Sequence, residues 1–139
     1  VQHIANQVAA DHNRVANLSV ATMDPIEVNI SVELFSIALY ELIDNAFKFS
    51  DKDGLVSINL TAGLNGVSIE IIDQGKLCKA SELNVQSGAI GQIKRSKFEQ
   101  QGLGIGLALA MLIVNSQNGQ IFFEDVKPQG IRTEISLNQ

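Results

Sequence analysis

The clearest periodicity in the chain is helical and begins after Ser31. Apolar residues recur from position 32 to position 47 at spacings of three and four, which predicts a long helix with Ser31 as its N-cap. Residues 107–114 predict a buried helix that stops at the Gln117-Asn118-Gly119 tripeptide. A weaker apolar stripe predicts a further helix over residues 1–17.

Most of the remaining well-patterned segments alternate between apolar and polar residues, as half-buried strands do. The Asn65-Gly66 dipeptide indicates a tight hairpin between two of these segments. Only residues 74–101 lack a strong pattern, apart from one possible short helix near 80–85, and a stretch of this length is more often functional than decorative. The predicted strands are 26–30, 56–60, 67–72, 121–126 and 131–137, with a short apolar run of strand-forming residues at 18–21.

These elements predict an α/β (α+β) two-layer sandwich, in which helices cover one face of a mixed, mostly antiparallel sheet. The length of 139 residues is typical of one domain, and 45% hydrophobic residues are enough for a core. The formal net charge of −5 argues against nucleic acid or an anionic membrane as a partner, because both would repel an acidic surface.

Several sequence features bear on location and on metal binding. A single cysteine, Cys78, excludes an internal disulfide and fits a reducing compartment, and we expect a cytoplasmic location. No signal peptide is visible, and the longest apolar run, 105–114, is too short to span a bilayer. His3 and His12 have no paired cysteine, so we expect them to be solvated helix residues. Since the chain begins with valine, we expect it to be a piece of a longer protein.

Polar residues follow one side of the long predicted helix. Glu41, Asn45 and Lys48 are separated by four and three positions, so they share a face. An asparagine oxygen and a carboxylate one turn apart could hold a hydrated Mg²⁺, and a lysine one turn further could meet a phosphate. By spacing alone, an ordinary solvated face is equally compatible with this pattern.

Two glycine-containing segments add candidate chemistry. Asp73 ends a predicted strand, where its carboxylate could accept a hydrogen bond from an amino group such as that of adenine, and Gly75 could let a flat ring approach the backbone. Asp-x-Gly is also common in turns. Gly102, Gly104 and Gly106 precede a helix, where backbone N–H groups can hold phosphates. Their spacing matches neither a Rossmann nor a Walker A loop, so they form either another phosphate loop or a hinge.

In order and content, these segments resemble the ATP-binding catalytic domain of sensor histidine kinases, in the GHKL superfamily with gyrase, Hsp90 and the MutL proteins. Residues 40–49 resemble the N box, and residues 73–75 resemble the first glycine box. Phe98 resembles the F-box aromatic, and residues 102–108 resemble the second glycine box. The resemblance covers about residues 28–137.

The resemblance implies a Bergerat-type fold, ATP and Mg²⁺ as cofactors, and histidine protein kinase activity. It assigns catalytic roles to Glu41 and Lys48, and Mg²⁺ binding to Asn45 with Glu41. Residues 76–101 would form an ATP lid, in which Lys94, Arg95 or Lys97 reaches the phosphates. The implied nucleotide-binding residues are Asn45, Phe49, Asp73, Gly75, Arg95, Phe98, Gly102, Leu103, Gly104, Ile105, Gly106, Leu107 and Thr133.

The resemblance also implies partners outside the sequence. The γ-phosphate would pass to a histidine on an upstream dimerisation domain, and from there to the receiver domain of a response regulator. Residues 1–139 would be one ATP-binding domain, with residues 1–17 as the lead-in helix from that upstream domain. Any membrane attachment would come only from other parts of the parent protein.

Three positions differ from the family pattern: Leu77 replaces a glycine, Leu103 replaces a serine or threonine, and Tyr40 replaces a histidine. Two alternatives therefore stay open. The first is a degenerate GHKL module that binds nucleotide weakly or not at all and acts through protein contacts. The second is a GHKL ATPase or an anti-sigma-type serine kinase.

Overall fold

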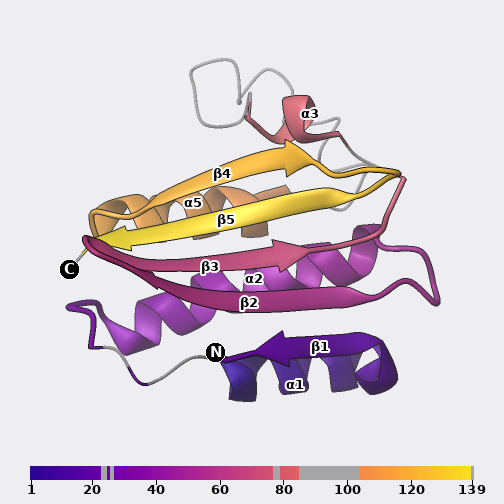
Figure 1. Cartoon of the computed structure of the whole chain (residues 1–139), viewed down its shortest axis with the longest axis horizontal. Coiled ribbons are helices and arrows are strands. Elements are labelled where there is room, and N and C mark those ends of the chain that lie inside the picture. The colour runs from indigo at the N-terminus through magenta and orange to yellow at the C-terminus, as the bar shows by residue number, and fades with distance from the viewer. Residues whose placement is uncertain (23–24, 26, 77–78, 85–103, 139) are drawn as a thin grey trace.

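A computed structural model describes residues 1–22, 25, 27–76, 79–84 and 104–138 (Figure 1). Its helices are α1 (Gln2–Asp11), the 3-10 helix η1 (Val15–Asn17), α2 (Val32–Phe49), α3 (Ala80–Asn84) and α5 (Gly104–Ser116). Its strands are β1 (Leu18–Ala21), β2 (Val56–Gly63), β3 (Gly66–Ile72), β4 (Gln120–Asp125) and β5 (Ile131–Asn138).

The strands form one sheet in the order β1-β2-β3-β5-β4. Strand β1 pairs with β2 in parallel, and the other three pairs are antiparallel. Helices α1, α2 and α5 lie on one face of the sheet (Figure 1). The predicted two-layer sandwich with a mixed, mostly antiparallel sheet is confirmed, and so is the hairpin between β2 and β3. Its two turn residues are Leu64 and Asn65, one position before the predicted dipeptide, because Gly66 already pairs with Gly63.

Helix α2 is the central helix of the second layer. Ser31 caps it, because its hydroxyl oxygen accepts a hydrogen bond from the backbone N–H of Leu34 at 3.4 Å. Burial of one large apolar side chain contributes roughly 1.5–3 kcal/mol, more than the spread of about 0.7 kcal/mol in helix propensity among residues other than glycine and proline, so packing on the sheet holds this helix in place. The buried residues of α2 are Phe35, Ala38, Leu39, Leu42, Ile43, Ala46, Phe47 and Phe49.

Helix α5 packs beside α2 and is longer than the predicted span of 107–114. Its end agrees with the predicted stop. Asn118 adopts a left-handed φ of 58°, and the N–H of Gly119 donates to the carbonyl of Val114 at 3.0 Å.

The helix predicted over residues 1–17 is shorter in the structure. Helix α1 ends at Asp11, because Asn13 turns the backbone into the left-handed region with φ of 55°, which stops an α-helix. The prediction for His12 was wrong as well. Its ring stacks on Phe47 with centroids 5.4 Å apart, and its Nε2 lies 2.7 Å from an Asp44 oxygen, whereas His3 is exposed as predicted.

The strand predicted over residues 26–30 is absent from the described residues of that span, 27–30. Val28 and Ile30 pack against the core with partial burial, which accounts for the alternating pattern. The N–H of Ile30 donates to the carbonyl of Val28 at 3.1 Å, so the backbone bends there and does not pair with a neighbouring strand.

Arg14 connects the segment after α1 to the C-terminal end of α2. Its guanidinium lies over the Phe47 ring at 5.1 Å and donates hydrogen bonds to the carbonyl of Phe47 (2.9 Å) and to the hydroxyl of Ser50 (2.7 Å). It also donates to the carbonyls of Asp51 and Gly54, at 2.7 and 2.6 Å. Carbonyls at the end of a helix lack helical partners, so Arg14 satisfies groups that the fold would otherwise leave to solvent.

Arg14→Met is therefore expected to lower the free energy of unfolding by about 2–3 kcal/mol, because several charge-assisted hydrogen bonds are lost together. Urea unfolding followed by circular dichroism measures this change. Arg132→Met is the matched control. Arg132 pairs with Glu70 and Glu124 on the surface, where ion pairs contribute about 0–1 kcal/mol. Equal losses for the two variants would contradict the role of Arg14.

None of the helices in the described part of the chain combines the length and the apolar character needed to cross a membrane.

Candidate functional site

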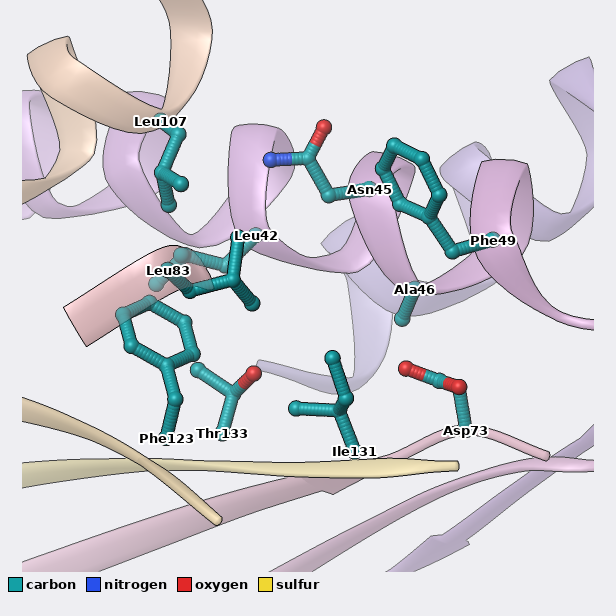
Figure 2. Close-up of a pocket in the computed structure, with 10 residues that line it drawn as sticks. All are labelled: Leu42, Asn45, Ala46, Phe49, Asp73, Leu83, Leu107, Phe123, Ile131 and Thr133. Atoms are coloured by element: carbon teal, nitrogen blue, oxygen red, sulfur yellow. The ribbon is translucent and has the colours of Figure 1, made fainter. Parts of the chain in front are cut away.

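A small cavity lies between the C-terminal half of α2 and the sheet (Figure 2). Figure 2 shows side chains of α2 above it and side chains of β4, β5 and the end of β3 below it. The volume of about 20 Å³ is room for roughly one water molecule. Its lining residues are Leu42, Asn45, Ala46, Phe49, Asp73, Leu83, Leu107, Phe123, Ile131 and Thr133.

Five predicted site residues from four separate parts of the sequence meet in this cavity. Asn45 and Phe49 come from successive turns of α2, whereas Asp73 follows β3 and Thr133 lies on β5. Leu107, at the start of α5, closes one side (Figure 2). Strand pairing explains part of this arrangement, since Thr133 is the register partner of Ile71.

Asn45 presents an unsatisfied polar atom to this region. Within the described part of the chain, its buried Nδ2 has no hydrogen-bond partner. Because a buried donor without an acceptor costs free energy, such an atom needs an explanation. A bound group that accepts from the amide, or that turns its oxygen towards a metal, would supply one.

Asp73 is a buried carboxylate with only 6% of its surface exposed. Burial raises the pKa of this carboxyl, and backbone hydrogen bonds with Gly75 and Ile131 partly oppose the rise. One of these bonds runs from the N–H of Gly75 to Oδ1 at 2.8 Å. In Figure 2 the carboxylate points from the sheet towards α2. Such a group can accept from an amino donor in a site that excludes water.

Gly75 connects the segment after β3 to the end of α2 through its backbone. It forms an isolated antiparallel bridge with Ser50, the residue that follows α2. A Cβ atom at position 75 would collide with the carbonyl of Phe49, far inside van der Waals contact. The steric reason for glycine in the described structure is therefore close approach of the protein's own backbone.

Gly75→Ala is expected to lower the free energy of unfolding by about 1–3 kcal/mol, because the backbone bridge must open to admit the methyl group. Thermal or urea unfolding measures the loss. Gly63→Ala is the matched control, since its Cβ would lie 3.8 Å from the nearest atom, an ordinary contact. A Gly75→Ala protein as stable as Gly63→Ala would contradict the proposed bridge.

Glu41 lies one turn before Asn45 but does not belong to the described cavity lining. Its carboxylate lies directly against Gly106, so closely that a Cβ at position 106 would collide with it. The predicted second glycine box therefore approaches the predicted N box at this point. Ile105 is exposed and Leu107 is buried, as expected for neighbours on a helix that begins at Gly104.

Lys48 is not among the described residues that line the cavity. Its Nζ lies 2.6 Å from Oδ2 of Asp44, one turn earlier on α2, and 46% of its side chain is exposed. Although Glu41, Asn45 and Lys48 follow one side of the helix as predicted, only Asn45 lines the cavity.

Sequence reasoning identified Phe49 and Leu107 but missed the other apolar residues of this lining. Leu42, Leu83, Phe123 and Ile131 belong to the same patterns as the rest of the core, so no local signal separated them. Leu83 comes from α3, inside the segment predicted to be an ATP lid. Several other predicted residues fall outside the described part of the chain: Lys94, Arg95, Lys97, Phe98, Gly102 and Leu103, and also Leu77.

The described residues offer no cluster of three or more histidine, cysteine or acidic side chains that could enclose a metal ion. Mg²⁺ does not require one, because it keeps several waters and takes the remaining ligands from one or two side chains and substrate phosphates. The side chain of Asn45, whose Nδ2 has no partner among the described residues, and the carboxylate of Glu41 fit this smaller requirement.

Comparison with known proteins gives one family match and several relatives. The family model described as "Histidine kinase-, DNA gyrase B-, and HSP90-like ATPase" matches residues 29–139. The chain is 29% identical to the adaptive-response sensory kinase SasA of Synechococcus sp. (strain JA-3-3Ab), over 79% of the chain and 29% of that protein. It is 25% identical to the sensor protein CreC of Escherichia coli (strain K12), over 83% of the chain and 24% of that protein. The chain thus spans less than a third of the length of these relatives.

Solved structures agree in fold. The mycobacterial sensor histidine kinase MprB superposes with a TM-score of 0.70 at 20% identity, covering 99% of this chain and 93% of that one. The nucleotide-free catalytic domain of histidine kinase ThkA gives 0.72 at 14% identity, with 99% and 90% covered. The cytoplasmic segment of histidine kinase QseC gives 0.61 at 15% identity, with 99% and 70% covered. At these identities the likeness establishes the fold alone.

Proposed function

The chain belongs to the histidine kinase-, DNA gyrase B- and HSP90-like ATPase family, and on this premise we propose that it is the ATP-binding catalytic domain of a two-component sensor histidine kinase. One observation carries the proposal. Asn45 and Asp73, predicted from separate motifs to hold the metal and the adenine, line the same cavity. The named relatives, which are sensor kinases, support the assignment to this branch of the family.

In the proposed complex, adenine lies in the buried part of the cavity. The Asp73 carboxylate accepts from the adenine amino group, Thr133 lies near the ring, and Phe49 packs against it. These contacts favour adenine over a base that has no hydrogen-bond donor at this position. Such a base would leave the buried carboxylate of Asp73 without a partner, which costs free energy.

At the phosphate end, Asn45 and Glu41 hold a hydrated Mg²⁺, which neutralises charge on the phosphates when bound. Glu41 also orients the reacting group or takes its proton, and backbone N–H groups from residue 104 onwards face the phosphates. Lys48 contacts a phosphate after leaving Asp44. Positioning and charge neutralisation carry most of the catalysis in phosphoryl transfer.

The partners and location follow from the same proposal. The γ-phosphate passes to a histidine on an upstream dimerisation domain, and a response regulator receives it from there. The domain works in the cytoplasm, which is supported by its likeness to a structure named as the cytoplasmic segment of a histidine kinase.

The small cavity supports a second candidate, a family member that binds nucleotide weakly or not at all. A volume of about 20 Å³ cannot hold a purine ring, so ATP binding requires the lining to open. Leu83 is the lining residue contributed by α3, which packs against β4. Opening of this lining on addition of nucleotide is therefore the step that separates the two candidates.

Calorimetric titration of the chain with an ATP analogue and MgCl₂ distinguishes these candidates. Binding at micromolar to submillimolar concentrations supports the nucleotide site, whereas no binding at millimolar nucleotide contradicts it. Full-length protein incubated with ATP labelled at the γ-position then identifies the acceptor. Phosphohistidine is labile in acid and stable in base, whereas phosphoserine is stable in acid, so an acid-stable product would favour the serine kinase alternative.

A further inference from the structure

Asp44 precedes Asn45 on α2, and each of its two carboxylate oxygens has a partner. Oδ1 lies 2.7 Å from Nε2 of His12, and Oδ2 lies 2.6 Å from Nζ of Lys48. Because an ionised carboxylate only accepts hydrogen bonds, Nε2 of His12 must carry the proton in this contact. Only 14% of the Asp44 side chain is exposed, so both contacts are partly shielded from water.

The position of Asp44 is linked to the end of α1. The ring of His12 is held by its stacking on Phe47. One turn earlier on α2, the hydroxyl of Tyr40 donates to Oδ2 of Asp11 at 2.9 Å. Two successive turns of α2 are thus bonded to two consecutive residues at the end of α1. This arrangement gives Tyr40 a contact with α1 at the position where the family often has histidine.

The ammonium group of Lys48 could pair either with Asp44 or with a phosphate of a bound nucleotide. Its long, half-exposed side chain is attached to α2 one turn after Asn45, yet its ammonium lies at Asp44 and not at the cavity. An ammonium is a point charge on a flexible stem, so it can exchange one anionic partner for another. A triphosphate beside Asn45 would compete with Asp44 for the same charge.

We propose that Asp44 is a positioning residue that holds Lys48 away from the nucleotide cavity and links this restraint, through His12, to the end of α1. The inference rests on the proposed function, in which Lys48 contacts a phosphate. Binding of ATP replaces the Asp44–Lys48 ion pair with a phosphate–Lys48 pair. Asp44 therefore opposes ATP binding both by retaining the ammonium and by repelling the phosphates, and it has no effect on a ligand without phosphates.

The test uses Asp44→Asn, Lys48→Met and the double variant, with adenosine and Mg-ATP as ligands. Asn keeps the shape of Asp and an acceptor for His12, so the fold is expected to persist. Partly exposed ion pairs are weak, so Asp44→Asn is expected to tighten Mg-ATP binding about two- to fivefold, while adenosine affinity stays the same. When Lys48→Met is already present, adding Asp44→Asn is expected to give much less of this increase in Mg-ATP affinity.

Asp53→Asn is the control, because it makes the same change in net charge at an exposed turn beyond α2. Its Mg-ATP affinity is expected to change less than twofold. An Asp44→Asn protein that binds ATP no more tightly, or that gains equally for adenosine, would overturn the inference while leaving the proposed function standing. Failure of the unsubstituted chain to bind either ligand would overturn both. If circular dichroism shows that Asp44→Asn is unfolded, Asp44→Ser replaces it and is judged by the same outcomes.

Discussion

Asp73→Asn is expected to weaken ATP binding about 100-fold, because in the proposed complex one amino group would face another at the place of the accepting carboxylate. Asn can keep its oxygen at the N–H of Gly75, as Asp73 does at 2.8 Å. Its NH₂ group then occupies the place of the second carboxylate oxygen and meets the adenine amino group donor to donor. Titration with Mg-ATP measures the loss, and Asp53→Asn is the control for charge.

The same substitution is expected to increase the stability of the folded chain at neutral pH, although it weakens ATP binding. Burial raises the pKa of Asp73 in the folded chain above its ordinary value. The folded state therefore binds the proton more tightly, so the contribution of Asp73 to stability is full below the pKa of the unfolded chain and is lost as pH rises through the raised value. Asn never ionises, so the stability of Asp73→Asn relative to the unsubstituted chain should rise across this interval and then level off. A substitution that lowers both ATP affinity and stability at pH 7 would indicate a structural role for the carboxylate.

Asn45→Ala and Asn45→Asp are expected to abolish the Mg²⁺-dependent part of ATP binding with the fold intact. Within the described part of the chain the amide Nδ2 is buried without a partner, so its removal leaves no acceptor unpaired, and alanine is the better helix former. Asp would instead add a negative charge beside the phosphates. Titrations with ATP in the presence of MgCl₂ or of EDTA separate the metal-dependent affinity from the rest.

Asn115→Ala is the matched control, since Asn115 is an exposed asparagine on α5. Its unfolding curve and its two ATP affinities should match those of the unsubstituted chain. Unchanged Mg²⁺-dependent affinity in either Asn45 variant would refute the metal role.

The parts of the fold that the sequence predicted are those whose signals are local. The long apolar period and the Ser31 cap defined α2, and Asn65-Gly66 predicted the β2–β3 hairpin to within one position. The failures involve competing long-range contacts. Residues 27–30 alternate because Val28 and Ile30 pack on the core from a bent segment. Helix α1 stops early because Asn13 adopts a left-handed conformation. The spacing of apolar residues over positions 1–17 does not reveal this break.

The site shows the same division. Asn45 and Asp73 were predicted from separate motifs and share one cavity. The position of the Lys48 ammonium could not be predicted, because helical spacing equally allows a contact with Asp44, its neighbour at i−4. The role of His12 was missed because its partner lies 32 residues away in sequence. The contribution of Leu83 to the lining was missed because this apolar residue resembles any other core position.

The hydrogen bonds from Arg14 to the end of α2 affect where the N-terminal boundary of an expressed fragment should be placed. The family match begins at residue 29, yet α1 packs against α2 and β1 pairs with β2 further towards the N-terminus. A fragment of residues 29–139 would lack Arg14, the β1 edge and the buried face of α1, which contains Ala5 and Val8. Apolar surface of α2 would then meet water. The first residue of the family match is therefore a poor choice for the start of an expressed fragment. Fragments intended to be soluble should retain every residue from α1 onwards.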